Sequence, residues 1–196
     1  GDHAIVCARD EDDAGGSSSG KAYIYNVTTS ALLHTLDNPN PYDTSRNDRF
    51  GFSCAISGDH AIVSAYAEDD ANGVDSGKAY IFNVTTGALL HTLDNPNAYD
   101  TSQTDYFGYS VAMNDTHAII SASGEDGADG GNSGKAYIFD LSDGSLVSTV
   151  DNPNAYDTSA GDQFGLSVAM NDTHAVVGSI YESDWLGKAY IFSASV

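Results

Sequence analysis

Basic residues are scarce in this chain. Only 7 of its 196 residues are lysine or arginine, against 28 aspartates and glutamates, which gives a formal net charge of −21. Nucleic-acid binding depends on a basic surface that displaces counterions, so this balance argues against a DNA or RNA partner. An anionic membrane surface would repel the chain for the same reason. Two interpretations of the acidity stay open: solubility, especially in salt, or recruitment of divalent cations by clustered carboxylates.

Long apolar runs and the common catalytic and nucleotide-binding motifs are also missing. No apolar stretch approaches the roughly 20 residues that a membrane-spanning helix needs, so we expect no membrane insertion. The six histidines have no cysteine or histidine neighbour at the spacing of zinc ligands. Neither a Walker loop nor a dinucleotide fingerprint occurs. We therefore expect a protein that is not an enzyme.

The sequence repeats itself with a period of 57 residues. A Phe-Gly pair recurs at Phe50, Phe107 and Phe164. The segment Gly-Lys-Ala-Tyr-Ile starts at Gly20, Gly77, Gly134 and Gly187. Self-similarity at a fixed period of this length is the signature of a repeat architecture. We expect a single repeat domain over residues 1–196, with units at approximately 1–49, 50–106, 107–163 and 164–196.

Each unit reads as four strands, because β-branched and aromatic residues fill four segments and Gly, Asn, Asp and Pro fill the gaps. The first strand is predicted after the Phe-Gly pair, over residues 52–57, 109–113 and 166–170, and the fourth over residues 88–93 of the second unit. In the third strand Ala79 and Ile81 point to one face, and Tyr80 and Phe82 to the other. Both faces are apolar, which indicates a sheet covered on both sides, as in a propeller blade. The predicted fold class is all-β, a β-propeller-type repeat protein with four-stranded antiparallel blades and about 3.5 repeats.

The order of motifs carries a family resemblance. Each of the last three units runs from Phe-Gly-x-Ser through an Asp-containing turn and an Ala-(Ile/Val)-(Ile/Val) strand to Gly-Lys-Ala-Tyr-Ile-Phe. This order resembles the FG-GAP repeat of integrin alpha-like β-propellers, and it is most similar to the secreted bacterial versions. The resemblance covers almost the whole chain. It implies a non-catalytic adhesion or recognition module, located outside the cell or on its surface, that binds a protein or glycan.

The calcium loop of integrin-like members does not carry over. In those proteins it lies between strands 1 and 2, but here that connection is only residues 57–59, 114–116 or 171–173. Such a turn is too short to wrap an ion that takes six to eight ligands.

A different cation site is suggested by the acidic loops. Strands in a blade alternate in direction, so the loops after strand 2 and after strand 4 emerge on one rim. Glu-Asp pairs recur there before Gly-rich turns, and carboxylates are hard oxygen ligands of the kind that Ca²⁺ prefers. The candidate ligands are Glu11, Asp12, Asp13, Glu68, Asp69, Asp70, Asp75, Glu125, Asp126 and Asp129. The alternative is a solvated acidic face.

Three further sets of residues are candidates. Asn-x-Thr sequons in short turns predict glycosylation or simple turn chemistry at Asn26, Asn83, Asn114 and Asn171. Tyrosines on the acidic rim either stack on a ligand or hold their own loop, at Tyr42, Tyr99 and Tyr156. Cys7 and Cys54 would form a disulfide if their strands lie within about 7 Å.

The strand count leaves the repeat incomplete. The units supply four copies each of strands 2 and 3 but three each of strands 1 and 4, and an open strand edge favours pairing. Three outcomes stay open: a segment of a longer propeller, a small imperfect ring, or copies of the chain that complete one another head to tail. We expect a non-catalytic extracellular adhesion or recognition propeller. The alternative is a structural subunit of an extracellular filament or matrix, assembled by strand complementation between copies.

Overall fold

The computed structural model describes residues 1–14, 16–40, 44–71, 73–96, 102–127, 130–153, 160–182 and 186–194. The described part contains the fourteen predicted strands, arranged in four antiparallel sheets. The first sheet holds β1 (His3–Ala8), β2 (Lys21–Asn26) and β3 (Leu32–Asp37). The second holds β4 (Cys54–Ser57), β5 (His60–Ala65), β6 (Lys78–Asn83) and β7 (Leu89–Asp94).

The other two sheets follow the same plan. The third sheet holds β8 (Phe107–Met113), β9 (His117–Ala122), β10 (Lys135–Asp140) and β11 (Leu146–Asp151). The fourth holds β12 (Phe164–Met170), β13 (His174–Ser179) and β14 (Lys188–Ser193). Within each sheet the strands pair in chain order. Over the described residues, the first sheet therefore has no inner strand and the last has no outer one, as the strand count predicted.

The predicted bounds of the first and fourth strands were wrong by one or two residues. β8 and β12 begin at the Phe-Gly pair itself, because Phe107 pairs with Ala122 and Phe164 with Ser179 before a shift in register. In the second sheet the ladder starts later, at Cys54, because the N–H groups of Gly51 and Phe52 both donate to the Ser64 carbonyl. β7 runs from 89 to 94 rather than from 88 to 93.

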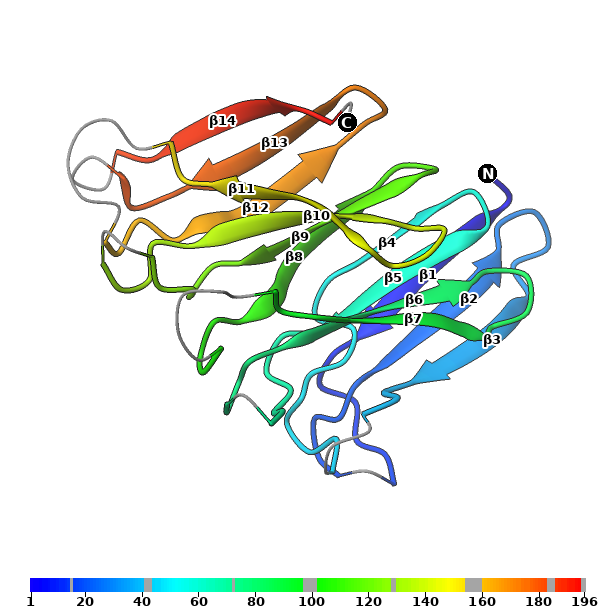
Figure 1. The fold of residues 1–196 in the computed structure, drawn as a ribbon. Coiled ribbons are helices and arrows are strands. Elements are labelled where there is room, and N and C mark those ends of the chain that lie inside the picture. Colours follow the sequence, from blue (N-terminus) through cyan, green and yellow to red (C-terminus); the bar gives the residue numbers. More distant parts are fainter. Residues whose placement is uncertain are drawn as a thin grey trace.

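The four sheets follow one another along an open arc, with β1–β3 at one end and β12–β14 at the other (Figure 1). Neighbouring sheets pack face to face, and the inner strands β4, β8 and β12 lie next to one another. The prediction for the third strand is confirmed, because Ala79, Tyr80, Ile81 and Phe82 are all buried. The sheets are thus blades of a propeller, each covered by its neighbours.

One covalent link joins two blades. A disulfide connects Cys7 in β1 with Cys54 in β4, and their Cα atoms lie 6.8 Å apart. It fastens the first sheet, which lacks an inner strand of its own, to the inner strand of the second. Among the described residues, no helix is long and apolar enough to cross a membrane.

Candidate functional site

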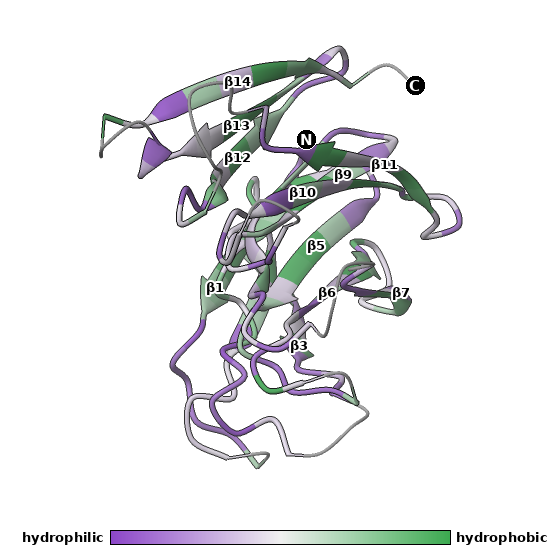
Figure 2. Cartoon of the chain, turned by 60° about the vertical axis from the view of Figure 1, so that its left-hand side comes forward, coloured by the Kyte–Doolittle hydropathy of each residue, from purple (hydrophilic) through white to green (hydrophobic). Residues whose placement is uncertain are grey.

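The long loops of the propeller form one continuous rim. The segment that leads into each inner strand lies along the preceding sheet's loop between its second and third blade strands. Asn47 N–H donates to the Ser17 carbonyl and Phe50 N–H to the Ser19 carbonyl, both at 2.9 Å. Thr104 with Val74 and Gly161 with Gly131 repeat the first of these bonds, also at 2.9 Å. Hydrophilic residues dominate these loops at the lower end of Figure 2, whereas β5 is largely hydrophobic. The loops are therefore braced by their backbones.

A glutamate anchors each loop to the strand that follows it, and in the second, third and fourth blades this glutamate is completely buried. The Tyr80 hydroxyl donates to both carboxylate oxygens of Glu68, at 2.7 and 2.8 Å, and Tyr137 does the same to Glu125 at 2.6 Å. Glu11 pairs in this way with Tyr23, whereas the Tyr190 hydroxyl donates to one carboxylate oxygen of Glu182. Because Glu68 is completely buried, desolvation raises the pKa of its carboxyl to about 8. Burial likewise raises the pKa values of Glu125, Tyr80 and Tyr137.

In the first three blades the residue after this glutamate is an aspartate, which fixes the shape of its loop. The Asp69 carboxylate accepts the backbone N–H of Asp75 at 2.8 Å, and Asp75 has a φ of 52°. Asp12 accepts from Ser18 and Asp126 from Asn132 in the same way, at 2.8 and 2.7 Å. A left-handed conformation is uncommon for residues other than glycine, so the side-chain bond offsets part of its cost.

Lysines form ion pairs with further carboxylates of the rim. Lys21 pairs with Asp13 and Lys78 with Asp70, and both lysines also pair with the aspartate that ends the fourth blade strand. In the third blade Lys135 pairs with Glu125 at 3.0 Å instead. Eight of the predicted cation ligands thus accept hydrogen bonds or form ion pairs inside the protein: Glu11, Asp12, Asp13, Glu68, Asp69, Asp70, Glu125 and Asp126.

The calcium prediction stays a prediction. Over the described ranges, no three or more His, Cys, Asp or Glu residues are grouped so that they could hold a metal ion. The Asp75 carboxyl has a raised pKa, first through burial and then through the nearby Asp69. Asp129 lies outside the described residues, as do the rim tyrosines Tyr42, Tyr99 and Tyr156.

An aromatic cluster lies where the rim meets the inner strands. The rings of Phe52 and Tyr66 are 4.2 Å apart between centroids, and Tyr109 lies 5.0 Å from Phe52. Tyr106 is 5.7 Å from Tyr66. All four rings are half-buried, so part of each faces water. We call these four residues, together with Arg9 and Arg49, the aromatic–arginine cluster.

Both arginines of the cluster lie over its rings. The Arg9 guanidinium is 5.1 Å from the Phe52 centroid and Arg49 is 5.9 Å from that of Tyr66. Arg49 also donates to the Tyr66 hydroxyl at 2.8 Å, which fixes the orientation of both groups. Two of the 7 basic residues of this acidic chain are thus placed on one aromatic platform. Such platforms stack on sugar rings or on planar side chains of a ligand.

Sequence reasoning missed this cluster because its aromatic residues do not recur in every unit. The positions equivalent to Tyr66 are Arg9, Ser123 and Ile180, and those equivalent to Phe52 are Tyr109 and Leu166. A signal was nonetheless available. Aromatic residues at positions where other units carry small or aliphatic ones indicate a local role beyond the shared fold.

The sequons lie in turns at the opposite end of the blades. Asn26 and Asn83 accept the N–H of the second threonine of Thr-Thr through Oδ1, at 2.8 and 2.9 Å. In the third blade Asp140 Oδ1 accepts the N–H of Ser142, as Asn26 and Asn83 also accept from the first threonine, although an aspartate cannot be glycosylated. This replacement favours turn chemistry at these positions. Asn114 and Asn171 close the other turn of the blade through bonds from His117 and His174.

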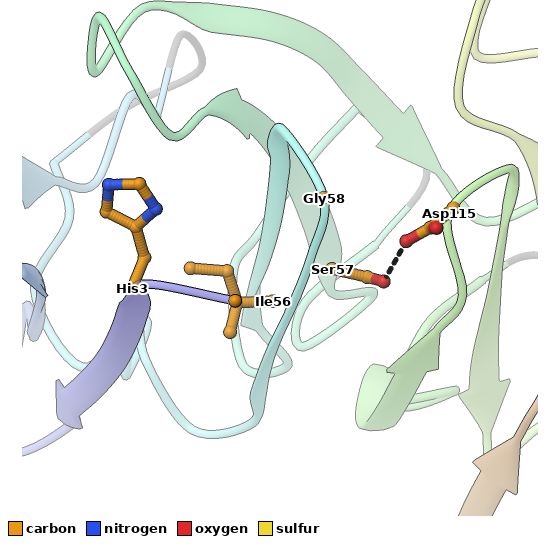
Figure 3. A pocket seen from close by; sticks show the side chains of 6 residues that line it. His3, Ile56, Ser57, Gly58 and Asp115 are labelled. Atoms are coloured by element: carbon orange, nitrogen blue, oxygen red, sulfur yellow. Dashed lines mark hydrogen bonds between the residues drawn. The ribbon is translucent and has the colours of Figure 1, made fainter. Parts of the chain in front are cut away.

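A pocket of about 390 Å³ lies at this same end, between the first three blades. His3, Ser57 and Asp115 line it, and Ser57 donates to the Asp115 carboxylate (Figure 3). Figure 3 shows the His3 imidazole on the other side of the pocket from this pair. A nucleophilic serine needs a base in hydrogen-bond reach that is itself oriented by a third group, with the imidazole between hydroxyl and carboxylate. In this pocket the serine hydroxyl bonds directly to the carboxylate and the imidazole does not lie between them, so the pocket does not have the geometry of such a triad.

The comparison with known families agrees with the fold. The FG-GAP repeat profile matches residues 40–82, 97–139 and 154–192, which together make up more than half of the chain. Each match starts ahead of an inner strand and ends within the third strand of that blade. No curated protein matches the chain. With its Phe-Gly inner strands and its antiparallel blades, the chain belongs to the FG-GAP repeat family.

Proposed function

We propose that this FG-GAP protein is a non-catalytic, extracellular recognition or adhesion module that binds a glycan or protein surface through the aromatic–arginine cluster. The single observation that carries the proposal is the cluster itself. Four half-buried aromatic rings and two arginines meet on a rim whose loops are held by backbone bonds. Binding residues are commonly found on loops that a rigid scaffold positions.

The chemistry of the cluster favours a glycan as the ligand. Aromatic faces offer a large apolar area at low entropic cost, and the arginines supply donors at its edge. A strongly anionic ligand is disfavoured, because the chain carries a net charge of −21. A neutral sugar chain therefore suits the cluster best.

Affinity electrophoresis in native gels tests this assignment, with laminarin, mannan and dextran as three neutral polysaccharide probes. We expect at least one to retard the wild-type chain, and Tyr66→Ala to weaken that retardation about tenfold or more, as for an aromatic hot spot. Leu89→Ala is the matched control, because Leu89 is an exposed apolar residue on an outer strand. Equal retardation of wild type and Tyr66→Ala would contradict the role of the cluster. No retardation by any probe would count against a neutral glycan and favour a protein ligand.

Dependence on divalent cations is the second part of the proposal. Its support is the crowding of carboxylates on the rim, where like charges destabilise the fold unless they are screened or paired. A calcium titration at constant ionic strength measures the effect, with magnesium as the comparison. A rise in melting temperature is expected with calcium, and an unchanged melting temperature would rule against a bound ion.

A further inference from the structure

Each blade has two apolar faces that pack in one direction. The forward face of a blade packs on the next blade along the chain, and the back face packs on the preceding one. In the second blade Ile62, Ala79 and Ile81 form the forward face. Its back face is formed by Ala61, Val63, Tyr80, Phe82 and Val84.

Three joints in the chain are built alike. Each buried cluster combines the forward face of one blade with the back face of the next. The first joint sets Ala22 and Ile24 against Val63 and Tyr80. The second and third joints are made from the equivalent residues of the later blades. A forward face and a back face are therefore complementary surfaces, and the chain shows three times how they meet.

Within the part of the chain that the structure describes, two faces of this kind have no blade against them. On the forward face of the last blade, Ile191 is 71% exposed and Val176 is 37% exposed, whereas their equivalents Ile81 and Ile62 are fully buried. β14 lies at the upper edge of the molecule in Figure 2, with hydrophobic residues along it. On the back face of the first blade, Val6 is 53% and Val27 is 51% exposed, whereas Val63 and Val84 are buried. Tyr23 and Tyr25 on that face are only half-buried.

We propose that these two faces bind each other between copies of the chain. The forward face of one copy would pack on the back face of a second copy, through the same contacts that join consecutive blades within a chain. The contact would repeat the joint between consecutive blades that the chain already contains three times. The named side chains on both faces are uncharged. The structure thereby favours face-to-face stacking of blades over pairing of strand edges.

Such a contact is heterologous, because it joins two different surfaces of the same chain. Heterologous contacts close into a ring if the rotation allows it and otherwise give open filaments. Two copies contribute eight blades, which is within the range of four to eight found in β-propellers. Because each copy carries a net charge of −21, we expect salt to promote the association by screening repulsion.

A pair of complementary variants tests the joint by sedimentation velocity in buffer with sodium chloride. Val6→Asp blocks the back face and Ile191→Asp blocks the forward face. Each side chain is more than half exposed, so both variants are expected to keep the wild-type circular dichroism and melting temperature. Val27→Asp and Val176→Asp are second variants of the two faces. Leu89→Asp is the control, because Leu89 is 43% exposed but lies on neither end face.

The wild-type chain and Leu89→Asp are expected to associate as the concentration rises to about 100 μM, a range that reports affinities in the micromolar class. Each blocked variant alone is expected to stay monomeric. In an equimolar mixture, Val6→Asp supplies an intact forward face and Ile191→Asp supplies an intact back face. The mixture is therefore expected to form a dimer and nothing larger. A monomeric wild type would overturn the proposal and leave the faces to another partner. Association of either blocked variant alone, or a mixture that stays monomeric, would overturn it as well.

Discussion

The buried carboxyl of Glu68 makes the stability of the protein depend on pH. Its pKa is raised from 4.5 to about 8, chiefly by burial. Between these two pH values the carboxyl is protonated in the folded state and ionised in the unfolded state. The folded pKa lies above the unfolded one. The stabilisation is therefore fully present below pH 4.5 and is lost as the pH rises through 8. At 1.36 kcal/mol for each pKa unit, the free energy of unfolding should fall by about 4 kcal/mol between pH 5 and pH 9 through this group alone.

The substitution Glu68→Gln removes the ionisable carboxyl and keeps the size and shape of the side chain. The glutamine carbonyl still accepts the hydrogen bond from the Tyr80 hydroxyl. Urea unfolding followed by circular dichroism at pH 5, 7 and 9, under non-reducing conditions, gives the free energy of unfolding of both proteins. We expect the wild type to lose about 4 kcal/mol more than Glu68→Gln over this range. Glu11→Gln is the control for loss of a negative charge from the rim, because Glu11 is only half-buried. Equal pH dependence of wild type and Glu68→Gln would refute the reasoning.

Three further predictions concern stability. Ile81→Ala removes a side chain buried between two blades and should cost about 3 kcal/mol, whereas Ile191→Ala at the equivalent exposed position should cost less than about 0.5 kcal/mol; equal costs in urea unfolding would contradict the exposure of the last blade. Asp69→Ala removes the acceptor for the Asp75 N–H and should cost about 1 kcal/mol in a thermal melt; an unchanged melting temperature would contradict the role of this bond. Replacing Cys7 and Cys54 by serine opens a link between residues 47 apart and should cost about 4 kcal/mol by chain entropy; unchanged unfolding of the double variant would argue against the bond.

The sequence predicted most of the fold because the 57-residue period repeats the same physical constraints. Alternation in Lys-Ala-Tyr-Ile-Phe showed both apolar faces of the third strand, and the structure buries both in the second and third blades. The starts of the inner strands were less predictable. A glycine with a φ of 91°, as at Gly108, can either end or continue a ladder, and the choice depends on tertiary pairing.

The acidic rim was harder to interpret from sequence. The rim carboxylates were expected either to bind a cation or to form a solvated face, yet Glu68 and Glu125 are completely buried. The signal was a constant spacing of twelve residues from each of these glutamates to the tyrosine of the third strand, as in Glu68 and Tyr80. A buried carboxylate needs a partner, and a tyrosine at fixed distance on an apolar face can supply one.

The unfilled blade faces also could not be found by counting strands. The count showed which strand edges are open, and it drew attention to edge pairing. Which faces lack a neighbour depends on the direction in which successive blades pack, and that direction follows from the contacts of residues such as Ile24 with Val63. Val6 and Ile191 are apolar residues whose equivalents in other blades, Val63 and Ile81, are buried. The sequence alone would therefore place them in the core.

The central claim is that this chain is an open run of FG-GAP blades whose two end faces are unfilled copies of its internal joint. A cryo-electron microscopy structure of the wild-type chain, at a concentration where it associates, tests this most directly. We predict that β12–β14 of one copy packs on β1–β3 of the next, with Ile191 and Val6 buried together. A closed single-chain disc, in which the last blade packs on the first blade of the same chain, would contradict the claim.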